Sequence, residues 1–361
     1  WRQPVPPWYI SNPNAQFVPY LLINIFHNWI CPIDYQRVEN PTPDGLDVSV
    51  VEVFPRFDTN KEKLPLVIIC PGLTGHASEL PGISIAKRIA ATGRYRVVGH
   101  NRRGHTPGEN GKLKAGVFHF AGDMDDIAAT IRNLREKFPE QCNVPFFLLG
   151  LSLGCLPAMV ACGYWDNLRA QGKKDQYGFD PPQAAGSVCI SGGGDLKECW
   201  KSFEWPYNRI LLHLVKDHFI RRNDKVLREA HGDDAVDRMV KTKDLSEFVS
   251  MSYRFAGFDS EDAFYEHYNS CWAFSYMTTP MFAMIAEDDG LTVLRNSYEI
   301  NSCPALNGKS LSQYVRSERQ DWSMFCAYPH TGSHLTFLDG GNFGWLEKID
   351  GCWMLNNWSE K

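Results

Sequence analysis

The chain has 361 residues, of which 43% are hydrophobic, and carries a formal net charge of −5. This length and composition suffice for one α/β domain with an insertion. The net negative charge gives no excess of basic residues that could bind nucleic acid, so nucleic acid is excluded as a partner. The eleven cysteines are scattered without a CxxC pair or another zinc-ligand spacing, which favours a reducing, intracellular compartment and no metal or other cofactor.

The N-terminal arm, residues 1–40, contains the longest apolar stretch, 17–30. Pro19, Asn24 and His27 interrupt this stretch, and it falls short of the roughly 18 apolar residues of a membrane span. We expect a packed arm, with a segment that contacts a membrane surface as the alternative. The numbering starts at Trp1 rather than at a methionine, so an anchor or signal that precedes this sequence stays open.

From residue 41 onward, short apolar strands alternate with helical segments. Residues 47–54 alternate apolar and polar side chains, as an antiparallel strand does. The later strands are apolar throughout, which is typical of parallel strands with helices on both faces. These strands are expected at 66–70, 95–100, 146–150, 186–190, 281–286 and 324–328. The order predicts an α/β fold with a mostly parallel central sheet flanked by helices.

The region 195–277 breaks this alternation, because its aromatic and charged residues recur at helical spacing and no strand pattern appears. We expect a helical lid inserted between two strands, which divides the core into 41–194 and 278–361. Aromatic residues such as Trp200 and Tyr207 are expected to form the core of the lid, and the alternative is that some line a substrate channel.

The stretch GLSLG, residues 150–154, joins a buried strand to a segment that suits a helix. A sharp strand-to-helix turn projects a serine hydroxyl clear of the backbone, and its neighbours two positions away must be small because the helix and the adjacent strand crowd them. The pattern therefore predicts Ser152 as a nucleophile, with Gly150 and Gly154 required by packing. The alternative is a capping serine in a glycine-rich loop.

Such a nucleophile needs an acid and then a histidine after later strands. The segment EDDGLT offers Asp288 and Asp289. We prefer Asp289 because it directly precedes the glycine turn, and Asp288 is the alternative. The segment PHTGSH offers His330 and His334. His334 lies beyond a Thr-Gly-Ser turn, where an accessible loop can bring it to both partners, whereas His330 is closer to the strand and suits a structural role.

A hydrolase of this kind also needs backbone amides that stabilise an oxyanion. The glycines of PGLTGH, residues 71–76, allow amides to face the bottom of a pocket. The amides of Leu73 and Leu153 are the predicted donors, and no cofactor is needed.

With these motifs together, the chain resembles the α/β-hydrolase fold. It resembles more closely the α/β-hydrolase-domain lipase family (AB hydrolase type 4), which includes membrane-associated acylglycerol and phospholipid hydrolases and fungal medium-chain ester synthase/esterases. The likeness spans about 41–341 and rests on PGLTG, NRRGHTPGE, the aspartate-rich helix start after HFAG, GLSLG, FDSEDAFYEHYNS, AEDD and SHLTF. Members commonly carry His-Gly where this chain has Pro71-Gly72. The resemblance implies an N-terminal membrane anchor in many members, and it leaves the long basic loop 101–118 unexplained.

The expected activity is that of a serine esterase or lipase acting on hydrophobic, fatty acyl esters, with a small-molecule or lipid ester as substrate. The fatty acyl group is inferred from the apolar, aromatic composition of the lid. One alternative is an acyltransferase with an alcohol or lysolipid acceptor. His334 and Asp339 have the HxxxxD spacing of some acyltransferases, but His334 is already assigned to the predicted triad, so we interpret this match as a coincidence. Another is a receptor or structural subunit that retains the fold without catalysis.

Overall fold

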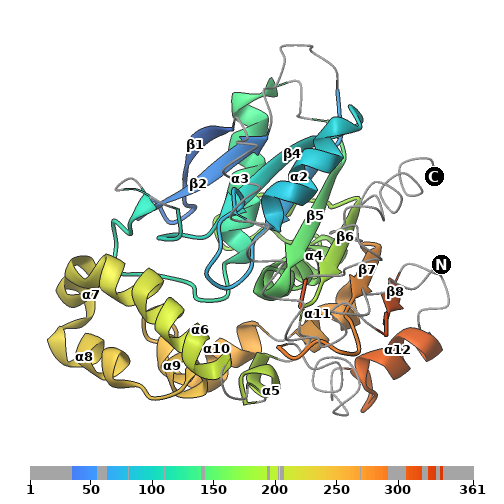
Figure 1. Cartoon of the computed structure of the whole chain (residues 1–361). Coiled ribbons are helices and arrows are strands. Elements are labelled where there is room, and N and C mark those ends of the chain that lie inside the picture. Colours follow the sequence, from blue (N-terminus) through green and yellow to red (C-terminus); the bar gives the residue numbers. More distant parts are fainter. Residues whose placement is uncertain are drawn as a thin grey trace, which may run out of the picture.

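The central element is a sheet of eight strands in the order β1-β2-β4-β3-β5-β6-β7-β8 (Figure 1). The computed structural model describes residues 35–54, 63–79, 81–106, 108, 111–139, 143–192, 196–201, 203, 207–268, 270–291, 306–318, 324–330 and 334–335. The strands are β1 (Gln36–Pro41), β2 (Val48–Phe54), β3 (Leu66–Cys70), β4 (Arg96–Asn101), β5 (Phe146–Leu151), β6 (Gly186–Ile190), β7 (Met281–Met284) and β8 (Met324–Ala327). Strand β2 is antiparallel to β1 and β4, and the other neighbouring pairs are parallel. The predicted mostly parallel α/β sheet is confirmed.

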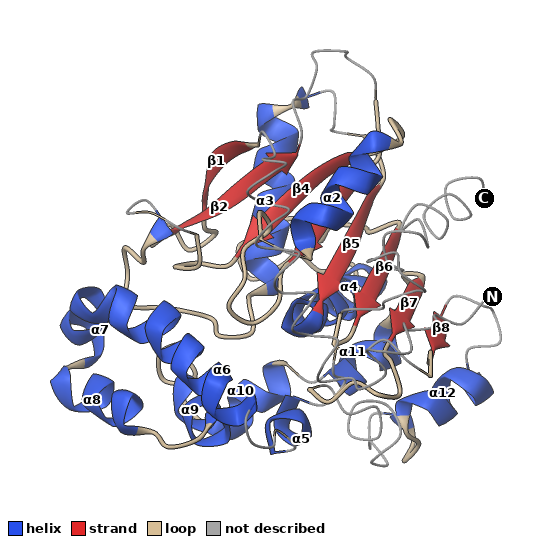
Figure 2. Cartoon of the chain, viewed as in Figure 1, coloured by secondary structure: helices blue, strands red, loops and turns tan. Residues whose placement is uncertain are grey.

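The apolar strands are buried because helices cover both faces of the sheet. Every residue of β3, β4, β5 and β6 is buried. Successive side chains point to opposite faces, so Val67 and Ile69 pack towards α2 (Gly82–Ala91), whereas Ile68 belongs to the core that includes α3 (Met124–Lys137) and α4 (Cys155–Ala170). Figure 2 shows α2 on one face and α3 and α4 on the other.

The strand order places a topological switch point beside β3. The chain passes from β3 to β4 on one side and then returns to β5 on the other side of β3. Ligands of open α/β sheets bind at the carboxyl ends of strands where the order reverses. The loops after β3 and β5 therefore meet at the position where a functional site is expected.

Strand β1 was not predicted, and it falls at the end of the expected arm. Its sequence, QRVENP, is mostly polar and exposed, because an edge strand pairs on one side only. The buried Asn40 donates hydrogen bonds to Ser49 and Thr130, and Val38 packs into the core, so both contacts hold the edge strand in place. The apolar stretch 17–30 lies outside the described residues. Along the described ranges, no helix combines the length and apolarity needed to cross a bilayer.

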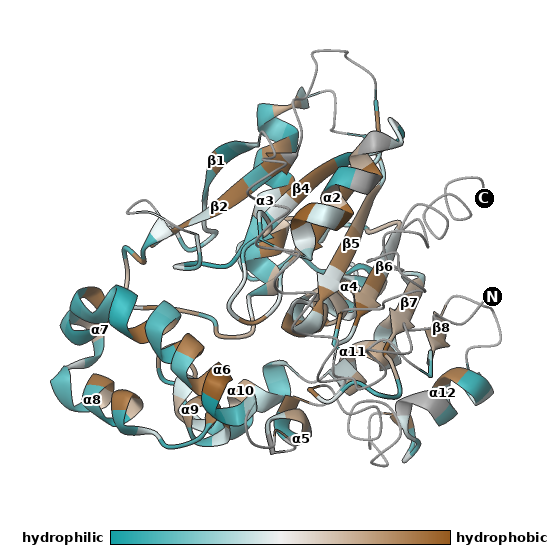
Figure 3. Ribbon diagram, in the orientation of Figure 1, coloured by the Kyte–Doolittle hydropathy of each residue, from teal (hydrophilic) through white to brown (hydrophobic). Residues whose placement is uncertain are grey.

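Between β6 and β7 the described residues form helices and no strand, and we call this region the helical insert. Its α-helices are α5 (Leu196–Lys201), α6 (Tyr207–Val215), α7 (Asp224–His231), α8 (Asp233–Lys241), α9 (Leu245–Ser252), α10 (Glu261–His267) and α11 (Ser270–Tyr276). Helices α7 and α8 alternate hydrophilic and hydrophobic bands in Figure 3. Leu227, Val236 and Met239 are fully buried, so these helices turn one apolar face inwards, although Val240 of α8 is exposed. Helix α12 (Leu311–Glu318) precedes β8.

The basic loop that the sequence left unexplained joins the insert to the core. Phe118 at the end of this loop and Phe120 just after it are fully buried among three insert phenylalanines. Ring centroids lie 5.0 Å apart for Phe118 and Phe219, and 5.8 Å apart for Phe120 and Phe248. Such aromatic pairs add favourable energy beyond the area they bury. The loop therefore supplies part of the core on which the insert folds.

Polar contacts reinforce this attachment. The Phe118 amide donates to the Phe255 carbonyl at 3.0 Å, and the Leu113 amide donates to Asn223 Oδ1 at 3.0 Å. The Arg222 guanidinium donates to the carbonyls of Thr106 and Gly108. The insert and the loop after β4 are thus joined by backbone as well as by side chains.

Asp166 of α4 anchors the chain where it returns from the insert to β7. Its carboxylate, fully buried, accepts hydrogen bonds from the amides of Thr278 (2.6 Å) and Thr279 (2.7 Å). Asp166→Ala would remove this acceptor from the buried Thr279 amide and the partly buried Thr278 amide, so we expect it to lower the free energy of unfolding by about 3 kcal/mol in urea denaturation. The exposed Asp180→Ala is the control, and an equal midpoint for the two variants would contradict the anchor.

Candidate active site

Ser152 stands at the turn between β5 and α4, in a backbone conformation that favours glycine. Its φ is +53°, in the left-handed region that is strained for a residue with a side chain. A three-residue turn, Ser152–Gly154, leads into α4. The strand–turn–helix setting predicted from GLSLG is confirmed, and it exposes the serine at the carboxyl end of the central strand.

The two glycines around Ser152 are required by close backbone contacts. A Cβ atom on Gly154 would lie 2.0 Å from the carbonyl oxygen of Cys70, at the end of β3. A Cβ atom on Gly150 would lie 2.4 Å from the Cα of Cys155, at the start of α4. One glycine is therefore crowded by the neighbouring strand and the other by the helix, as the GLSLG pattern predicts.

The structure brings the three preferred site residues into one chain of hydrogen bonds. His334 Nε2 lies 2.8 Å from Ser152 Oγ. His334 Nδ1 lies 3.0 Å from Asp289 Oδ2 and 3.1 Å from Asp289 Oδ1. Asp289 and His334 are both buried. This geometry has the form that proton transfer from a serine to a histidine requires.

Local structure fixes the acid and the histidine. Asp289 Oδ1 accepts a hydrogen bond from the Leu291 amide at 2.9 Å, and the Asp289 amide donates to the Ala286 carbonyl. A carboxylate held in this way accepts Nδ1–H of His334 and leaves Nε2 able to take a proton. The Leu335 amide, next to His334, donates to Ser191 Oγ at 3.3 Å. Sequence reasoning missed Ser191, which is fully buried with a φ of +53°.

The two alternatives occupy other positions. Asp288 is half-buried, and the carboxylate in contact with His334 belongs to Asp289. His330 is largely exposed, and its Nδ1 lies 2.6 Å from a carboxylate oxygen of Glu287. The geometry thus favours the residues that the turn patterns selected.

The loop after β3 lies against the serine. A Cβ atom on Gly72 would be 3.3 Å from Ser152 Cβ and 3.8 Å from Ser152 Oγ. Within the ranges that the structure describes, the amide of Leu73 has no hydrogen-bond acceptor. Leu153 directly follows Ser152 at the start of the turn into α4. Both amides stay predicted oxyanion donors, and their positions beside the serine suit that role.

A buried polar network behind this loop was missed from the sequence. His76 Nε2 lies 3.0 Å from Glu79 Oε1, and its Nδ1 lies 3.8 Å from the fully buried Glu52. Burial alone would lower the pKa of His76, but the hydrogen bonds and charges of Glu52 and Glu79 outweigh it and raise this pKa to about 9. The Ala77 amide donates to Asn101 Oδ1 at 2.8 Å. Strands β2 and β4 thus hold the far end of the loop.

The start of the helical insert lies within electrostatic range of the site. Tyr207, at the start of α6, has a raised pKa because of its burial and the negative charge of Asp289. The sequence indicated Tyr207 only as one of several lid aromatics. In the part of the chain that the structure describes, no cluster of three or more histidine, cysteine, aspartate or glutamate residues is arranged to hold a metal ion.

Comparisons with known proteins agree with this architecture. The sequence model of the Hydrolase_4 family, described as serine aminopeptidase, S33, matches residues 61–176. An esterase of Pyrococcus furiosus superposes with a TM-score of 0.51 at 13% identity, covering 100% of this chain and 97% of the esterase. No curated protein matches the sequence significantly.

Two peptidases are similar to the chain over part of their length. A puromycin-hydrolysing peptidase of Mycobacterium tuberculosis has a TM-score of 0.50 at 13% identity, covering 91% of this chain and 40% of the peptidase. An acylaminoacyl peptidase, in complex with Z-Gly-Gly-Phe-chloromethyl ketone, has the same TM-score and identity. This match covers 89% of the present chain and 41% of the peptidase. The chain thus has the α/β-hydrolase fold, and the part of it that carries β3 and GLSLG matches the Hydrolase_4 family.

Proposed function

We propose that the protein is a serine hydrolase that cleaves carboxylic esters of hydrophobic acyl groups. The observation that carries this proposal is the hydrogen-bonded series Ser152–His334–Asp289, with 2.8 Å between serine and histidine and 3.0 Å between histidine and aspartate. The serine stands on a strained turn, and backbone amides are available beside it. A buried carboxylate, an imidazole and a half-buried hydroxyl in this order form the machinery of acyl transfer.

The mechanism follows from the roles of these groups. His334 takes the Ser152 proton as the hydroxyl attacks the ester carbonyl, and Asp289 stabilises the resulting imidazolium. The amides of Leu73 and Leu153 donate to the oxyanion of the tetrahedral intermediate. His334 then protonates the leaving alcohol, and an acyl-enzyme ester forms on Ser152. Water, deprotonated by His334, attacks this ester, and the acid leaves while the serine regains its proton.

The substrate class is supported by chemistry near the site and in the insert. The likeness to an esterase over both whole chains agrees with ester cleavage. The insert is rich in aromatic residues, although Trp200, Phe219 and Phe248 are buried in its own core. The phenol of Tyr207, at the start of α6 in the insert, has its pKa raised by burial and by the negative charge of Asp289. We propose that hydrophobic acyl groups lie against this part of the insert.

Cleavage of amides is the second candidate, because the matching family and two similar structures are described as peptidases. The test is a panel of p-nitrophenyl esters, from acetate to palmitate, beside aminoacyl p-nitroanilides. We expect ester hydrolysis that rises with acyl length, and amide hydrolysis at least about 100-fold slower. Faster cleavage of the anilides would identify a peptidase instead.

Two further controls separate the remaining alternatives. A fluorophosphonate probe should label the wild-type chain, and absence of labelling would favour a non-catalytic protein. Product analysis with added ethanol should yield mainly free acid. A predominant ethyl ester would show that the acyl-enzyme passes its acyl group to alcohols, as an acyltransferase does.

A further inference from the structure

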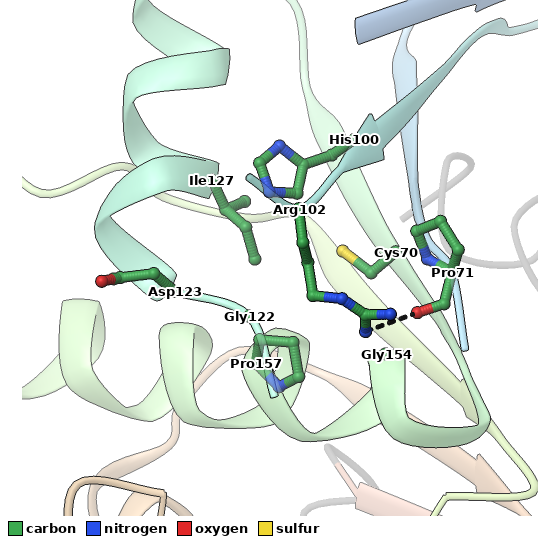
Figure 4. Close-up of a pocket in the computed structure, with 9 residues that line it drawn as sticks. All are labelled: Cys70, Pro71, His100, Arg102, Gly122, Asp123, Ile127, Gly154 and Pro157. Carbon is green, nitrogen blue, oxygen red and sulfur yellow. Dashed lines mark hydrogen bonds between the residues drawn. The ribbon is translucent and has the colours of Figure 1, made fainter. Parts of the chain in front are cut away.

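A buried arginine holds the loop that carries the predicted oxyanion donor. Arg102 directly follows β4, and the residue is 5% exposed. Its guanidinium donates to the carbonyls of three consecutive residues, with 3.2 Å to Pro71 O, 2.6 Å to Leu73 O and a further contact to Gly72 O. Figure 4 shows the guanidinium reaching from β4 to the Pro71 carbonyl, beside the start of α4.

The hydrogen bond from Arg102 to the Gly72 carbonyl also fixes the direction of the Leu73 N–H group. In a trans peptide unit the C=O and N–H bonds point in opposite directions. The carbonyl of Gly72 and the amide of Leu73 belong to one such unit. Because Arg102 binds the Gly72 oxygen, the Leu73 N–H points away from Arg102. This unit lies against Ser152, since a Cβ atom on Gly72 would be 3.3 Å from Ser152 Cβ.

The placement of Arg102 is energetically costly. Its hydrogen bonds among the described residues go to carbonyls, and burial lowers the pKa of Arg102 to about 10. Arg103, also buried, instead pairs with Asp126 at 2.6 Å and with Asp44 at 2.6 Å. A buried charge without an acidic partner is unfavourable unless other groups stabilise it. The three loop carbonyls provide that stabilisation.

The side chain also lies beside a small cavity. Arg102 lines this cavity together with His100, Asp123 and Pro157 (Figure 4). The Nε atom of Arg102 is buried and has no partner among the described residues. The guanidinium therefore binds the loop through its two terminal nitrogens. The rest of the Arg102 side chain lies beside the cavity and does not fill it.

We propose that Arg102 is a positioning residue that presets the oxyanion hole by fixing the carbonyls of residues 71–73. This inference rests on the proposed function. The positive charge of the Arg102 guanidinium, bound to these carbonyl oxygens, also polarises the peptide units. This polarisation makes the N–H groups of these units stronger hydrogen-bond donors. Lysine cannot replace this action, because its compact ammonium lacks the planar fork that spans several carbonyls.

The experiment compares Arg102→Lys with Arg103→Lys, two equivalent changes at adjacent buried arginines. Rates are normalised to the fraction of sites that a fluorophosphonate titrates. For Arg102→Lys we expect kcat for a p-nitrophenyl ester to fall about 10- to 100-fold, with KM changed less than about threefold, because an oxyanion interaction acts in the transition state. For Arg103→Lys we expect kcat within about threefold of wild type.

A second measurement does not depend on activity. Amide hydrogen exchange in the peptide that contains residues 71–79 should be faster in Arg102→Lys and unchanged in Arg103→Lys. Equal kcat losses in the two variants, or unchanged exchange in Arg102→Lys, would overturn the inference. If the wild-type chain hydrolyses no ester, the proposed function fails, whereas the exchange result still decides whether Arg102 holds the loop.

Discussion

Replacing Ser152 by alanine is expected to reduce kcat/KM for ester hydrolysis by about 10⁴-fold or more and to abolish fluorophosphonate labelling. The reason is that the variant lacks the oxygen that lies 2.8 Å from His334 Nε2. The measurement is the initial rate with a p-nitrophenyl ester, together with probe labelling of the purified chain. Ser252→Ala is a matched control, because Ser252 is fully buried in α9 and bonds to the Val249 carbonyl.

The partners of the serine should behave as one unit with it. Asp289→Asn is expected to lower kcat by up to about 10⁴-fold, since an amide favours the wrong tautomer of His334. Ser152→Ala combined with His334→Ala should be no slower than Ser152→Ala alone, because groups that act together are not additive. Substantial ester turnover by Ser152→Ala would place the nucleophile elsewhere in the chain.

Gly154→Ala is expected to prevent stable folding or to lower the free energy of unfolding by more than about 4 kcal/mol. The added Cβ atom would lie 2.0 Å from the Cys70 carbonyl oxygen and 2.5 Å from the Pro71 carbonyl oxygen. Both contacts are with backbone, so relief requires α4 to separate from β3. Soluble yield and urea denaturation measure the effect.

Gly75→Ala is the control for this substitution. Its Cβ atom would lie 3.5 Å from Glu79 Oε2, which is ordinary van der Waals contact. We expect a change in unfolding free energy within about 1 kcal/mol. A wild-type denaturation midpoint for Gly154→Ala would show that the strand and the helix are further apart than the structure places them.

The sequence predicted those parts of the fold that depend on residues close together in the chain. The strands β3 and β5 are continuous apolar runs because helices cover both of their faces. Ser152 was recognisable because the turn requires glycine on both sides. Asp289 and His334 followed from chain order and from the glycine and Thr-Gly-Ser turns beside them, and the structure brings their side chains together.

The parts that sequence did not predict depend on partners distant in the chain. Strand β1 is polar because its residues face solvent at an edge. Arg102 and His76 are charged residues, which are ordinarily exposed. Arg102 is buried because carbonyls about 30 residues earlier accept its hydrogen bonds. No periodicity or spacing in the sequence indicates these hydrogen bonds, so the contact between Arg102 and residues 71–73 is seen only in the structure.

The attachment of the helical insert has a consequence for how substrate reaches Ser152. Swinging the insert outwards as a rigid flap would carry Phe219 and Phe255 away from Phe118 and expose their rings to water. It would also break the amide-to-carbonyl bond between Phe118 and Phe255. Each fully exposed phenylalanine costs roughly 1.5–3 kcal/mol. We therefore expect the insert to keep its position against the core, so that the acyl chain of the proposed substrate would reach Ser152 past the insert without displacing it.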